Sequence, residues 1–490
     1  MTTPIALRLI DANESLYAKQ PKVYPREIDG RFQRLRTAAV FWLLGMFYLF
    51  PWLRWDGRQM VLFDLPARRF YVFGFTFWPQ DFYLLTLLLI SAAVTLFFFT
   101  AVAGRLWCGF ACPQTVWTEV FLWIERRIEG DRNKRIKLDA APWSREKLLK
   151  KTAKQALWIG FAAWTGFTFV GFFTPIRELS GELATFSLGG WESFWIVFYG
   201  FATYGNAGYL REQVCKYMCP YARFQGAMFD RDTLIISYDD ARGEPRGGRK
   251  RSVPAVATRA TTAESLAINA DAMGWPDAAV LGDCIDCAAC VQVCPTGIDI
   301  RHGLQYECIA CAACIDACDG VMDKMNYPRG LIRYTTENML IDAKPRRVVR
   351  PRTLIYAGIL TGLLAAFVVG VLTRTPVLAE MMHDRNALYR EAADGAIENI
   401  YNVRLVNKTD AAITVQARVT SDEAILAVQM VALHLAANEV AQMPLTLQAA
   451  ADAVDGKRSV QIDFVDAAGK VVAHTRAPFF APAGHPHGKR

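Results

Sequence analysis

The sequence predicts a polytopic α-helical membrane protein with a cysteine-rich soluble domain inserted between its helices and a β-sandwich in its C-terminal part. Three observations support this prediction. Hydrophobic residues make up 53% of the 490 positions although 21% are charged, a mixture typical of apolar spans joined by soluble segments. All twelve cysteines fall into closely spaced motifs. The C-terminal part alternates apolar and polar residues in short runs, as strands do.

Five apolar runs approach the roughly 20 residues that a helix needs to cross a bilayer. They are Thr37–Trp55, Phe82–Gly104, Gln155–Thr174, Trp191–Tyr209 and Leu354–Leu372. The first four carry Trp or Tyr near their ends, as residues at a membrane interface do. We therefore expect about five transmembrane helices.

The placement of lysine and arginine predicts the orientation. These residues cluster before the first run, between the second and third, and before the fifth, whereas the loop after the third run has few. Because cytoplasmic loops carry this excess, the N-terminus is expected on the cytoplasmic side of a bacterial inner membrane and the C-terminal domain in the periplasm. The outer segment 56–81 leaves open a further membrane-embedded element around Phe70–Trp78. The net charge of +8 accompanies no nucleic-acid motif, so no nucleic-acid partner is expected.

These runs give the predicted domain boundaries. Residues 1–36 form a cytoplasmic segment, 37–209 a four-helix membrane domain, 210–351 a cytoplasmic region with a cysteine-rich core at about 275–330, 353–373 the fifth transmembrane helix and 385–490 a periplasmic β-domain. The Gly/Arg-rich stretch 240–252 is predicted to be a loop. Strands are expected at Ile400–Leu405, Ala412–Val419, Ser459–Phe464 and Val471–Ala473.

Eight cysteines lie in two copies of one spacing. Cys284, Cys287, Cys290 and Cys294 follow the C-x2-C-x2-C-x3-C-P pattern, and Cys308, Cys311, Cys314 and Cys318 repeat it. This is the ligand spacing of a bacterial-type 2[4Fe-4S] ferredoxin domain, in which the fourth cysteine of each copy serves the other cluster. One cluster would take Cys284, Cys287, Cys290 and Cys318, and the other Cys308, Cys311, Cys314 and Cys294. The alternative is zinc, whose sites usually pair two C-x2-C halves across a longer stretch.

Two details refine this prediction. The second copy has Asp319 and Gly320 where the first has Pro295, so we expect an altered exit turn there. Small residues stand between the cysteines and would let backbone N–H groups approach the cluster sulfurs: Ala288, Ala289, Ala310, Ala312 and Ala313.

The remaining four cysteines form two C-x3-C-P motifs. Cys108 and Cys112 follow the second apolar run, and Cys215 and Cys219 follow the fourth, so both pairs are expected at the cytoplasmic membrane face. Residues i and i+4 share one face of a helix, so each pair could present two sulfurs to one metal site. Thiolates favour Cu(I), zinc or an iron–sulfur cluster. A third cluster and a transient copper ion both stay open, as does a buried cysteine pair without a metal.

Other cofactors lack a sequence signal. No histidine lies in a predicted span, which excludes a membrane haem with two histidine ligands, and no G-x-G-x-x-G unit indicates a nicotinamide or flavin. Electrons must therefore arrive from a separate donor, expected on the cytoplasmic side. Met381, Met382 and His383 after the last span, with His485 and His487, could bind copper, but such residues are more often interfacial packing and a mobile tail.

With these motifs in view, the chain resembles the cytochrome c oxidase accessory proteins called CcoG or FixG, also RdxA. The resemblance covers nearly the whole length. It is carried by WCGFACPQTVWTE, EQVCKYMCPYARFQGAMFD, LIISYDDARGEPRG, CIDCAACVQVCPTGIDIR, CIACAACIDACD and YPRGLIRYTTEN, and by IENIYNVRLVNKTD, which is similar to the family's C-terminal immunoglobulin-like domain.

The resemblance implies a cupric reductase that supplies Cu(I) during assembly of a cbb-type oxidase. Cys108, Cys112, Cys215 and Cys219 would then face copper or make the last electron relay. Implied partners are oxidase assembly factors, including a copper-exporting P-type ATPase, together with membrane lipid; a homodimer stays open. The membrane half is also similar to polyferredoxins of nitrate and nitrous-oxide reduction, so an electron-relay subunit is the main alternative. An oxidase-assembly scaffold is another.

Overall fold

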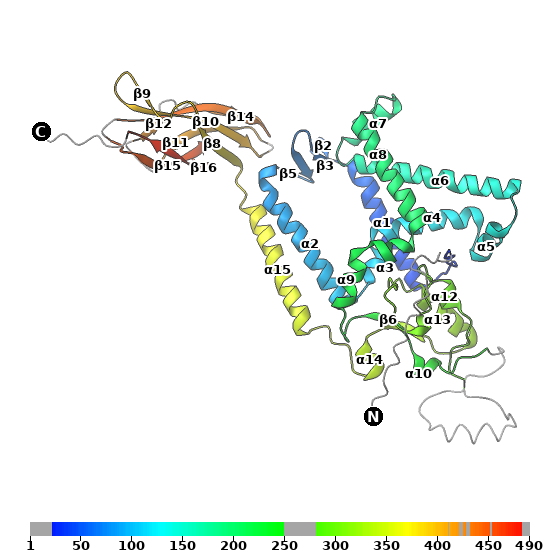
Figure 1. Cartoon of the computed structure of the whole chain (residues 1–490). Helices are drawn as coiled ribbons and strands as arrows, with labels where there is room; N and C mark the ends of the chain where they lie inside the picture. Colours follow the sequence, from blue (N-terminus) through cyan, green and yellow to red (C-terminus); the bar gives the residue numbers. More distant parts are fainter. Residues whose placement is uncertain are drawn as a thin grey trace, which may run out of the picture. The chain divides into compact units, whose positions relative to one another are not determined.

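A computed structural model describes residues 22–248, 281–409, 411–420, 425–427, 432–450 and 453–482 (Figure 1). The chain divides into two compact units. One comprises Met1–Trp52 and Ala92–Leu360, and the other Leu53–Ser91 and Thr361–Arg490. Each unit therefore combines segments that are far apart in the sequence.

Three helical segments among the described residues are long and apolar enough to cross a membrane: Arg31–Trp52, Pro79–Ala103 and Pro351–Leu372. They contain the helices α1 (Arg31–Leu49), α2 (Phe82–Ala103) and α15 (Pro351–Leu372). The predicted span 155–174 overlaps α6 (Arg145–Val170), whose first turns are charged and which ends four residues before the predicted end. The predicted span 191–209 falls in α8 (Gly190–Thr203) with the π-helix that follows it. Membrane helices are thus present, and the full count of five stays a prediction.

The first unit also contains shorter helices. They are α3 (Leu106–Phe110), α4 (Pro113–Glu129), α5 (Arg132–Ala140), α7 (Ile176–Ala184), α9 (Pro220–Met228), α10 (Asp240–Gly243) and α14 (Glu337–Ile341), with two π-helices at Tyr204–Leu210 and Val214–Met218. The predicted loop 240–252 is therefore wrong at its start, because the side chain of Asp239 accepts a hydrogen bond from Arg242 N and caps the helical turn α10. Residues 249–252 lie outside the described part.

A buried ionic network joins α4, α5 and the first π-helix. The Glu125 carboxylate is fully buried and lies 3.1 Å from Arg135 Nη1 and 2.9 Å from Arg211 Nη2. The Arg211 Nε also donates to Gly208 O at 2.8 Å. The network therefore fixes the backbone just before Cys215, where two π-helices replace the α-helix; such irregular turns are frequent at functional sites.

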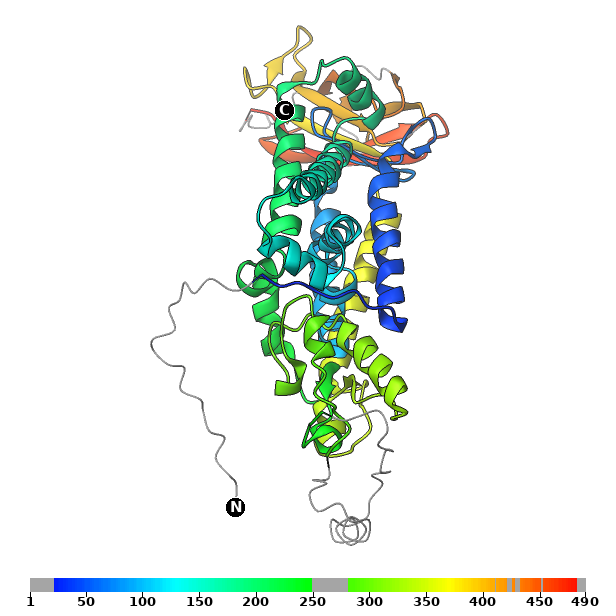
Figure 2. The same cartoon turned by 90° about the vertical axis from the view of Figure 1, so that its right-hand side faces the viewer.

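The cysteine-rich segment closes on itself through a two-stranded antiparallel sheet. Strand β6 (Ile235–Tyr238) precedes it, and β7 (Ile332–Thr335), which follows it, pairs with β6. Between them lie α12 (Ala289–Gln292), a 3-10 turn at Ile300–His302 and α13 (Ala313–Met325). Helix α13 packs against α1 (light green and blue in Figure 2).

The second unit contains a β-sandwich of two antiparallel sheets. One has the order β12-β14-β10-β8, with β9 beside β10, and the other β13-β11-β15-β16. The strands are β8 (Val377–His383), β9 (Arg390–Glu391), β10 (Ile397–Asn407), β11 (Ile413–Val419), β12 (Ile425–Ala427), β13 (Leu433–Leu435), β14 (Val440–Ala449), β15 (Lys457–Asp466) and β16 (Val471–Phe480). Three of the four predicted strand runs lie within these strands, and the fourth, Ala412–Val419, begins one residue before β11.

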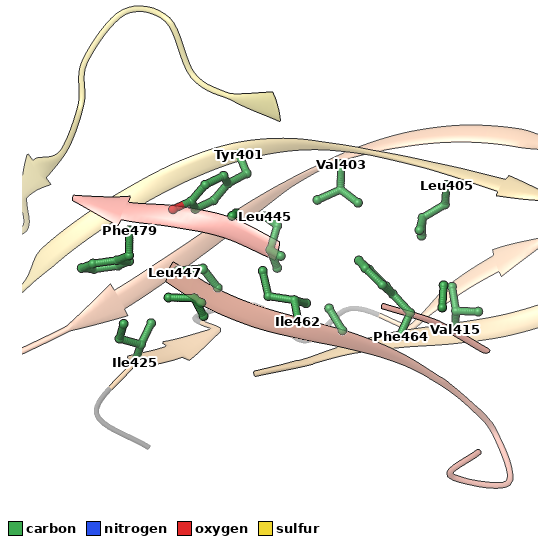
Figure 3. Packing of buried hydrophobic residues seen from close by; sticks show 14 of the residues in the cluster. Tyr401, Val403, Leu405, Val415, Ile425, Leu445, Leu447, Ile462, Phe464 and Phe479 are labelled. Atoms are coloured by element: carbon green, nitrogen blue, oxygen red, sulfur yellow. The ribbon is translucent and has the colours of Figure 1, made fainter. Parts of the chain in front are cut away.

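Alternation along each strand builds the sandwich core. Tyr401, Val403 and Leu405 point from β10 into the space between the sheets, where they meet Phe464 and Phe479 from the opposite sheet (Figure 3). All of these side chains are at most 1% exposed. Since successive residues of a strand face opposite sides, the intervening positions of β10 face away from this core.

The same unit includes the segment 53–81, which folds into short strands. Strands β1 (Arg54–Trp55) and β2 (Arg58–Gln59) form one pair, and β3 (Val61–Asp64), β4 (Arg69–Val72) and β5 (Phe75–Phe77) form a small sheet. After them, the buried Asp81 lies 2.9 Å from Lys408 Nζ and 2.6 Å from Arg374 Nη2. This carboxylate therefore ties the start of α2 to the sandwich.

Candidate metal centres

The eight clustered cysteines surround two cavities of similar size. The first, of about 360 Å³, is lined by Cys284, Cys287, Cys290 and Cys318. The second, of about 340 Å³, is lined by Cys294, Cys308, Cys311 and Cys314, with Cys290 at its edge. The structure thus brings together the two sets that the crossed spacing predicts. Aliphatic side chains complete both linings, among them Ile332 in the first and Ile300 in the second.

The backbone repeats itself around the two cavities. Ala288 and Ala312, each directly after the second cysteine of its copy, have φ angles of 51° and 62°. Asp286 and Ala310, two residues earlier, have φ angles of 52° and 53°. Non-glycine residues reach this left-handed region at a cost of order 1–3 kcal/mol each, which marks functional sites. The same left-handed residues at both cavities are explained if the backbone of each copy must turn tightly around a cluster.

The two copies leave their cavities differently. In the first copy α12 ends at Gln292, before Cys294 and Pro295. In the second copy α13 continues through Cys318 to Met325, because Asp319 and Gly320 keep the N–H groups that a proline would lack. The expected altered exit turn is therefore an uninterrupted helix. The side chain of Asp319 accepts a hydrogen bond from Gly330 N at 3.0 Å.

At these cysteines, burial raises the pKa of the thiol and nearby positive charges lower it. Burial raises the pKa of the Cys290 thiol to about 11, while the guanidinium of Arg301 opposes the rise. Burial likewise raises the pKa of the Cys311 thiol, and the positive charge of Arg36 opposes it. Thiols of this kind stay protonated near neutral pH unless a cationic metal partner holds the thiolate, so metal binding must release protons.

The two C-x3-C-P motifs have the same local geometry, which is not the one the sequence predicts. Cys108 lies in α3, but Cys112 is the N-cap of α4, whose first residue is Pro113. Cys215 lies in a π-helix, and Cys219 is the N-cap of α9, which begins at Pro220. The expectation that each pair shares one face of a helix is therefore wrong. Proline favours the first position of a helix and so starts a new one after each second cysteine.

Even so, the structure brings the four cysteines of these motifs together. Burial raises the pKa of the Cys215 thiol to about 12, and the nearby thiols of Cys112, Cys108 and Cys219 raise it further. Burial also raises the pKa of the Cys108 thiol to about 11, with a further contribution from Cys112. Four half-buried cysteines near one another are an arrangement that suits an iron–sulfur cluster or a soft metal cation.

This four-cysteine site touches the segment around the second cavity. Cys108 packs with Val293 and Cys311 in one buried cluster. A β-carbon on Gly109 would lie 2.8 Å from both Cys311 Cα and Ile309 O, so only glycine permits this approach. Cys290 lines both ferredoxin-like cavities, and Cys108 packs beside the second of them. The two cavities and the C-x3-C-P cysteines therefore lie in sequence, each next to the one before.

Two residues of this site carry no sequence signal of their own. Gln225, fully buried on α9, lies with Nε2 3.5 Å from Cys108 Sγ. Arg105 donates to Cys308 O at 3.3 Å and to Ala222 O at 2.7 Å, and so joins both cysteine regions. Gln225 could have been suspected only because it lies two turns into the helix that Cys219 caps.

Within the described residues, no three His, Cys, Asp or Glu side chains are gathered closely enough for one metal ion. A [4Fe-4S] cube holds its four thiolates farther apart than a single ion does, so cysteine-lined cavities fit a cluster. The copper ligands considered after the last span are placed otherwise. The ring of His383 bonds to Asp384 O and Asn399 Oδ1 and packs on Tyr401. His485 and His487 lie outside the described residues.

Comparisons with known proteins agree with this geometry. A family described as a 4Fe-4S dicluster domain matches residues 210–337, one described as a 4Fe-4S binding domain matches 85–130, and one described as the IG-like fold at the C-terminal of FixG matches 367–482. The chain is 39% identical to "Nitrogen fixation protein FixG" of Rhizobium meliloti over 80% of this chain and 78% of that protein. The chain belongs to the FixG family.

Two further relatives come from Cereibacter sphaeroides. RdxB is 42% identical over 83% of this chain and 84% of that protein, and RdxA is 41% identical over 81% of each chain. The predicted fold class is confirmed: a FixG-family chain with apolar membrane helices, 4Fe-4S ferredoxin domains and an Ig-like C-terminal sandwich. The matched families also assign it iron–sulfur clusters and an oxidoreductase character.

Proposed function

We propose that this FixG-family protein reduces Cu(II) to Cu(I) for the assembly of a cbb-type cytochrome c oxidase. The observation that carries the proposal is the packing of Cys108, one of the four cysteines of the C-x3-C-P motifs, against Val293 and Cys311 beside the second cysteine-lined cavity. Electrons stored in the ferredoxin-like region would thus have only a short distance to travel from the second cavity to Cys108.

Two sets of cysteines would hold the [4Fe-4S] clusters. Cys284, Cys287, Cys290 and Cys318 line one cavity, and Cys294, Cys308, Cys311 and Cys314 line the other. When bound, the clusters supply one-electron redox chemistry. The surrounding aliphatic side chains exclude water, and the left-handed residues Ala288 and Ala312 turn the backbone around each cavity.

The four cysteines of the C-x3-C-P motifs would act on copper itself. Thiolates are soft ligands and bind Cu(I) more tightly than harder ions, so they favour the reduced product. Each Cu(II) takes up one electron and no proton. Gln225 and Arg105 would position Cys108, since one contacts its sulfur and the other holds the neighbouring backbone. The same cysteines could instead hold a third cluster that passes electrons on to copper.

The proposal includes a topology and partners. The distribution of Lys and Arg favours a cytoplasmic N-terminus and ferredoxin domain and a periplasmic sandwich in the inner membrane of a bacterium. The domain boundaries predicted from the sequence belong to the same proposal. Oxidase assembly factors, including a copper-exporting P-type ATPase, would deliver or receive the copper. The proposal holds equally for a monomer and for a homodimer.

The test uses the full-length protein in detergent, reduced by dithionite under anaerobic conditions and then desalted. Added Cu(II) should give one Cu(I), trapped by a chelator, for each electron lost from the clusters. The double variant Cys108→Ser/Cys215→Ser should keep the iron and sulfide of both ferredoxin clusters but lose most Cu(I) formation. Met218→Ser, an exposed change within the same motif, is the matched control and should behave like wild type.

The same variants separate the alternatives. Cluster reoxidation without Cu(I), or unchanged Cu(I) formation in the double variant, would contradict the proposed reaction. If the cysteine variants retain oxidase copper content in cells while deletion of the sandwich abolishes it, the protein is an assembly scaffold. Loss of one further cluster's iron from the double variant would assign a third cluster to these four cysteines.

A further inference from the structure

A large groove lies between α1, α4 and α6 in the first unit. Its walls include Leu44, Gly45 and Tyr48 of α1 and Phe161 and Trp164 of α6. Helix α1 belongs to one of the three segments apolar enough to cross a membrane. One end of the groove is therefore expected to face lipid.

The apolar wall is built from aromatic rings. Tyr48 stacks on Trp164 with ring centroids 4.2 Å apart and planes inclined by 17°. The ring of Phe161 lies 5.9 Å from Tyr48. Trp164 remains 49% exposed, so the stacked pair is not covered by the protein itself. Such a wall suits a flat ring followed by a hydrocarbon tail.

The opposite end of the groove is ionic and buried. Arg36 and Glu119 are 5% and 8% exposed and form an ion pair. Arg126 Nη2 lies 3.0 Å from Glu119 Oε1. The Nε atoms of Arg36 and Arg126 are buried without a hydrogen-bond partner among the described residues. Buried donors of this kind normally find a partner, so both Nε–H groups are available to a polar ligand or to water at this end of the groove.

This ionic end adjoins the second cysteine-lined cavity. Val293 and Pro295, the neighbours of Cys294, line the groove, and so does Ala313, the neighbour of Cys314. Arg36 is close enough for its charge to act on the Cys311 thiol. A head group bound at this end would thus lie next to residues that hold the electron-transfer centre.

From these contacts we propose that the groove binds a membrane quinol, a hydroquinone ring with an isoprenoid tail, as the electron donor; this rests on the proposed electron-transfer function. The tail lies along the aromatic wall. One ring hydroxyl donates to Glu119, and a ring oxygen accepts from Arg36 or Arg126. The donor therefore reaches the protein from the membrane, in place of the cytoplasmic donor that the sequence suggests.

The reaction balances with two one-electron acceptors. The quinol loses two electrons and two protons and leaves as the quinone. The electrons pass singly into the ferredoxin region, and the two protons are released to water at the ionic end of the groove. A phospholipid fits less well, because its phosphate would face the same carboxylate and would make no use of the adjoining cysteines.

The test blocks the groove at Gly45. A β-carbon at this position meets nothing within 4 Å, so Gly45→Leu places a bulky side chain in the groove wall without a backbone clash and also favours the helix. Gly358→Leu is the matched control, because Gly358 lies on α15, meets nothing within 4 Å and does not line the groove. The probe is a short-chain azidoquinone, photolysed with the full-length, cluster-loaded protein, and labelled peptides are identified by mass spectrometry.

We expect labelling of α1, α4 or α6 within the groove. Gly45→Leu should weaken it by about tenfold or more, the usual effect of a steric change in a binding pocket, and Gly358→Leu should leave it unchanged. A short-chain quinol should bleach the clusters of wild type and of the control faster than those of Gly45→Leu. Dithionite should bleach all three alike, which shows that the clusters are intact.

Labelling elsewhere, or a Gly45→Leu variant that binds and oxidises quinol like wild type, would overturn the inference. Displacement of the probe by phosphatidylglycerol without any quinol-driven bleaching would make the groove a lipid site and also overturn it. Cu(I) formation by dithionite-reduced protein serves as the separate measurement of the proposed function. If it proceeds while quinol fails, only the donor is wrong.

Discussion

Gly109 lies so close to Cys311 that a β-carbon added to it would stand 2.8 Å from the Cys311 α-carbon. The first residue belongs to a motif that follows a membrane helix, and the second to the ferredoxin-like segment. Their approach links the two groups of cysteines, and it leaves no room for a side chain at Gly109.

Gly109→Ala should therefore force these segments apart. We expect a loss of about 1–3 kcal/mol in stability, typical of overpacking, and slower Cu(I) formation at unchanged iron content. Gly226→Ala is the control, because a β-carbon there meets nothing within 4 Å. Thermal unfolding and the rate of Cu(I) formation measure the two effects. Wild-type behaviour of Gly109→Ala in both would show that the contact is not tight in solution.

Serine variants of the two outlying cysteines should affect different clusters. Cys318 lines the cavity of the first copy and Cys294 that of the second, so each variant should perturb the cluster of the other copy. EPR spectra of reduced Cys318→Ser and Cys284→Ser should lose the same signal, and those of Cys294→Ser and Cys308→Ser the other. If Cys294→Ser and Cys284→Ser lose one common signal, each copy binds its own cluster instead.

Asp81→Ala should destabilise the second unit. The carboxylate neutralises both Lys408 and Arg374, and its removal leaves two positive charges without their partner. Breaking a buried ion pair costs about 3–5 kcal/mol. Glu380→Ala removes a half-exposed pair with Arg404 and should cost less than about 1 kcal/mol. Limited proteolysis of the sandwich at rising temperature compares them, and equal losses would mean that Asp81 is not the anchor.

The network around Glu125 should make the first unit sensitive to acid. Burial raises the pKa of this carboxyl, but Arg211 and Arg135 outweigh burial and hold it below its usual range. Since the folded pKa is lower than the unfolded value of about 4.3, the stabilisation is complete above that pH and is lost as the pH falls through the folded pKa.

Glu125→Gln should accordingly be less stable than wild type near neutral pH by about 3 kcal/mol, and the difference should shrink below pH ~4.3. Unfolding followed by tryptophan fluorescence across this range measures it. Glu146→Gln, in an exposed pair with Lys150, is the control and should follow wild type. A constant difference between wild type and Glu125→Gln at all pH values would contradict the assignment.

Spacing along the chain predicts most of the cysteine-rich region, because ligands within a few residues of one another can only wrap a nearby centre. The grouping of Cys318 with Cys284 follows from the repeat for this reason. Helix interruptions are harder to predict. Pro113 and Pro220 start new helices, whereas the two π-helices around Cys215 flank Arg211, whose partner Glu125 lies on the distant helix α4.

Contacts between residues far apart in the chain could not be predicted from the sequence. Gln225 approaches Cys108 from a helix 117 positions away, and no local pattern marks it. The groove between α1, α4 and α6 has the same origin, since its ionic end joins Arg36 to Glu119 across 83 positions. The strands of the sandwich were predictable because their alternation is local, whereas their pairing into two sheets was not.

Cys290 borders both cysteine-lined cavities, and this shared wall has a consequence for how charge accumulates. Aliphatic side chains around the cavities screen electrostatic interactions poorly. A negative charge in one cavity therefore strongly opposes the addition of a second negative charge in the other cavity. Loading should therefore be anti-cooperative: a reductive titration would show two separate midpoints even for two chemically alike centres. The half-loaded protein would then be the prevailing species over a wide range of solution potential.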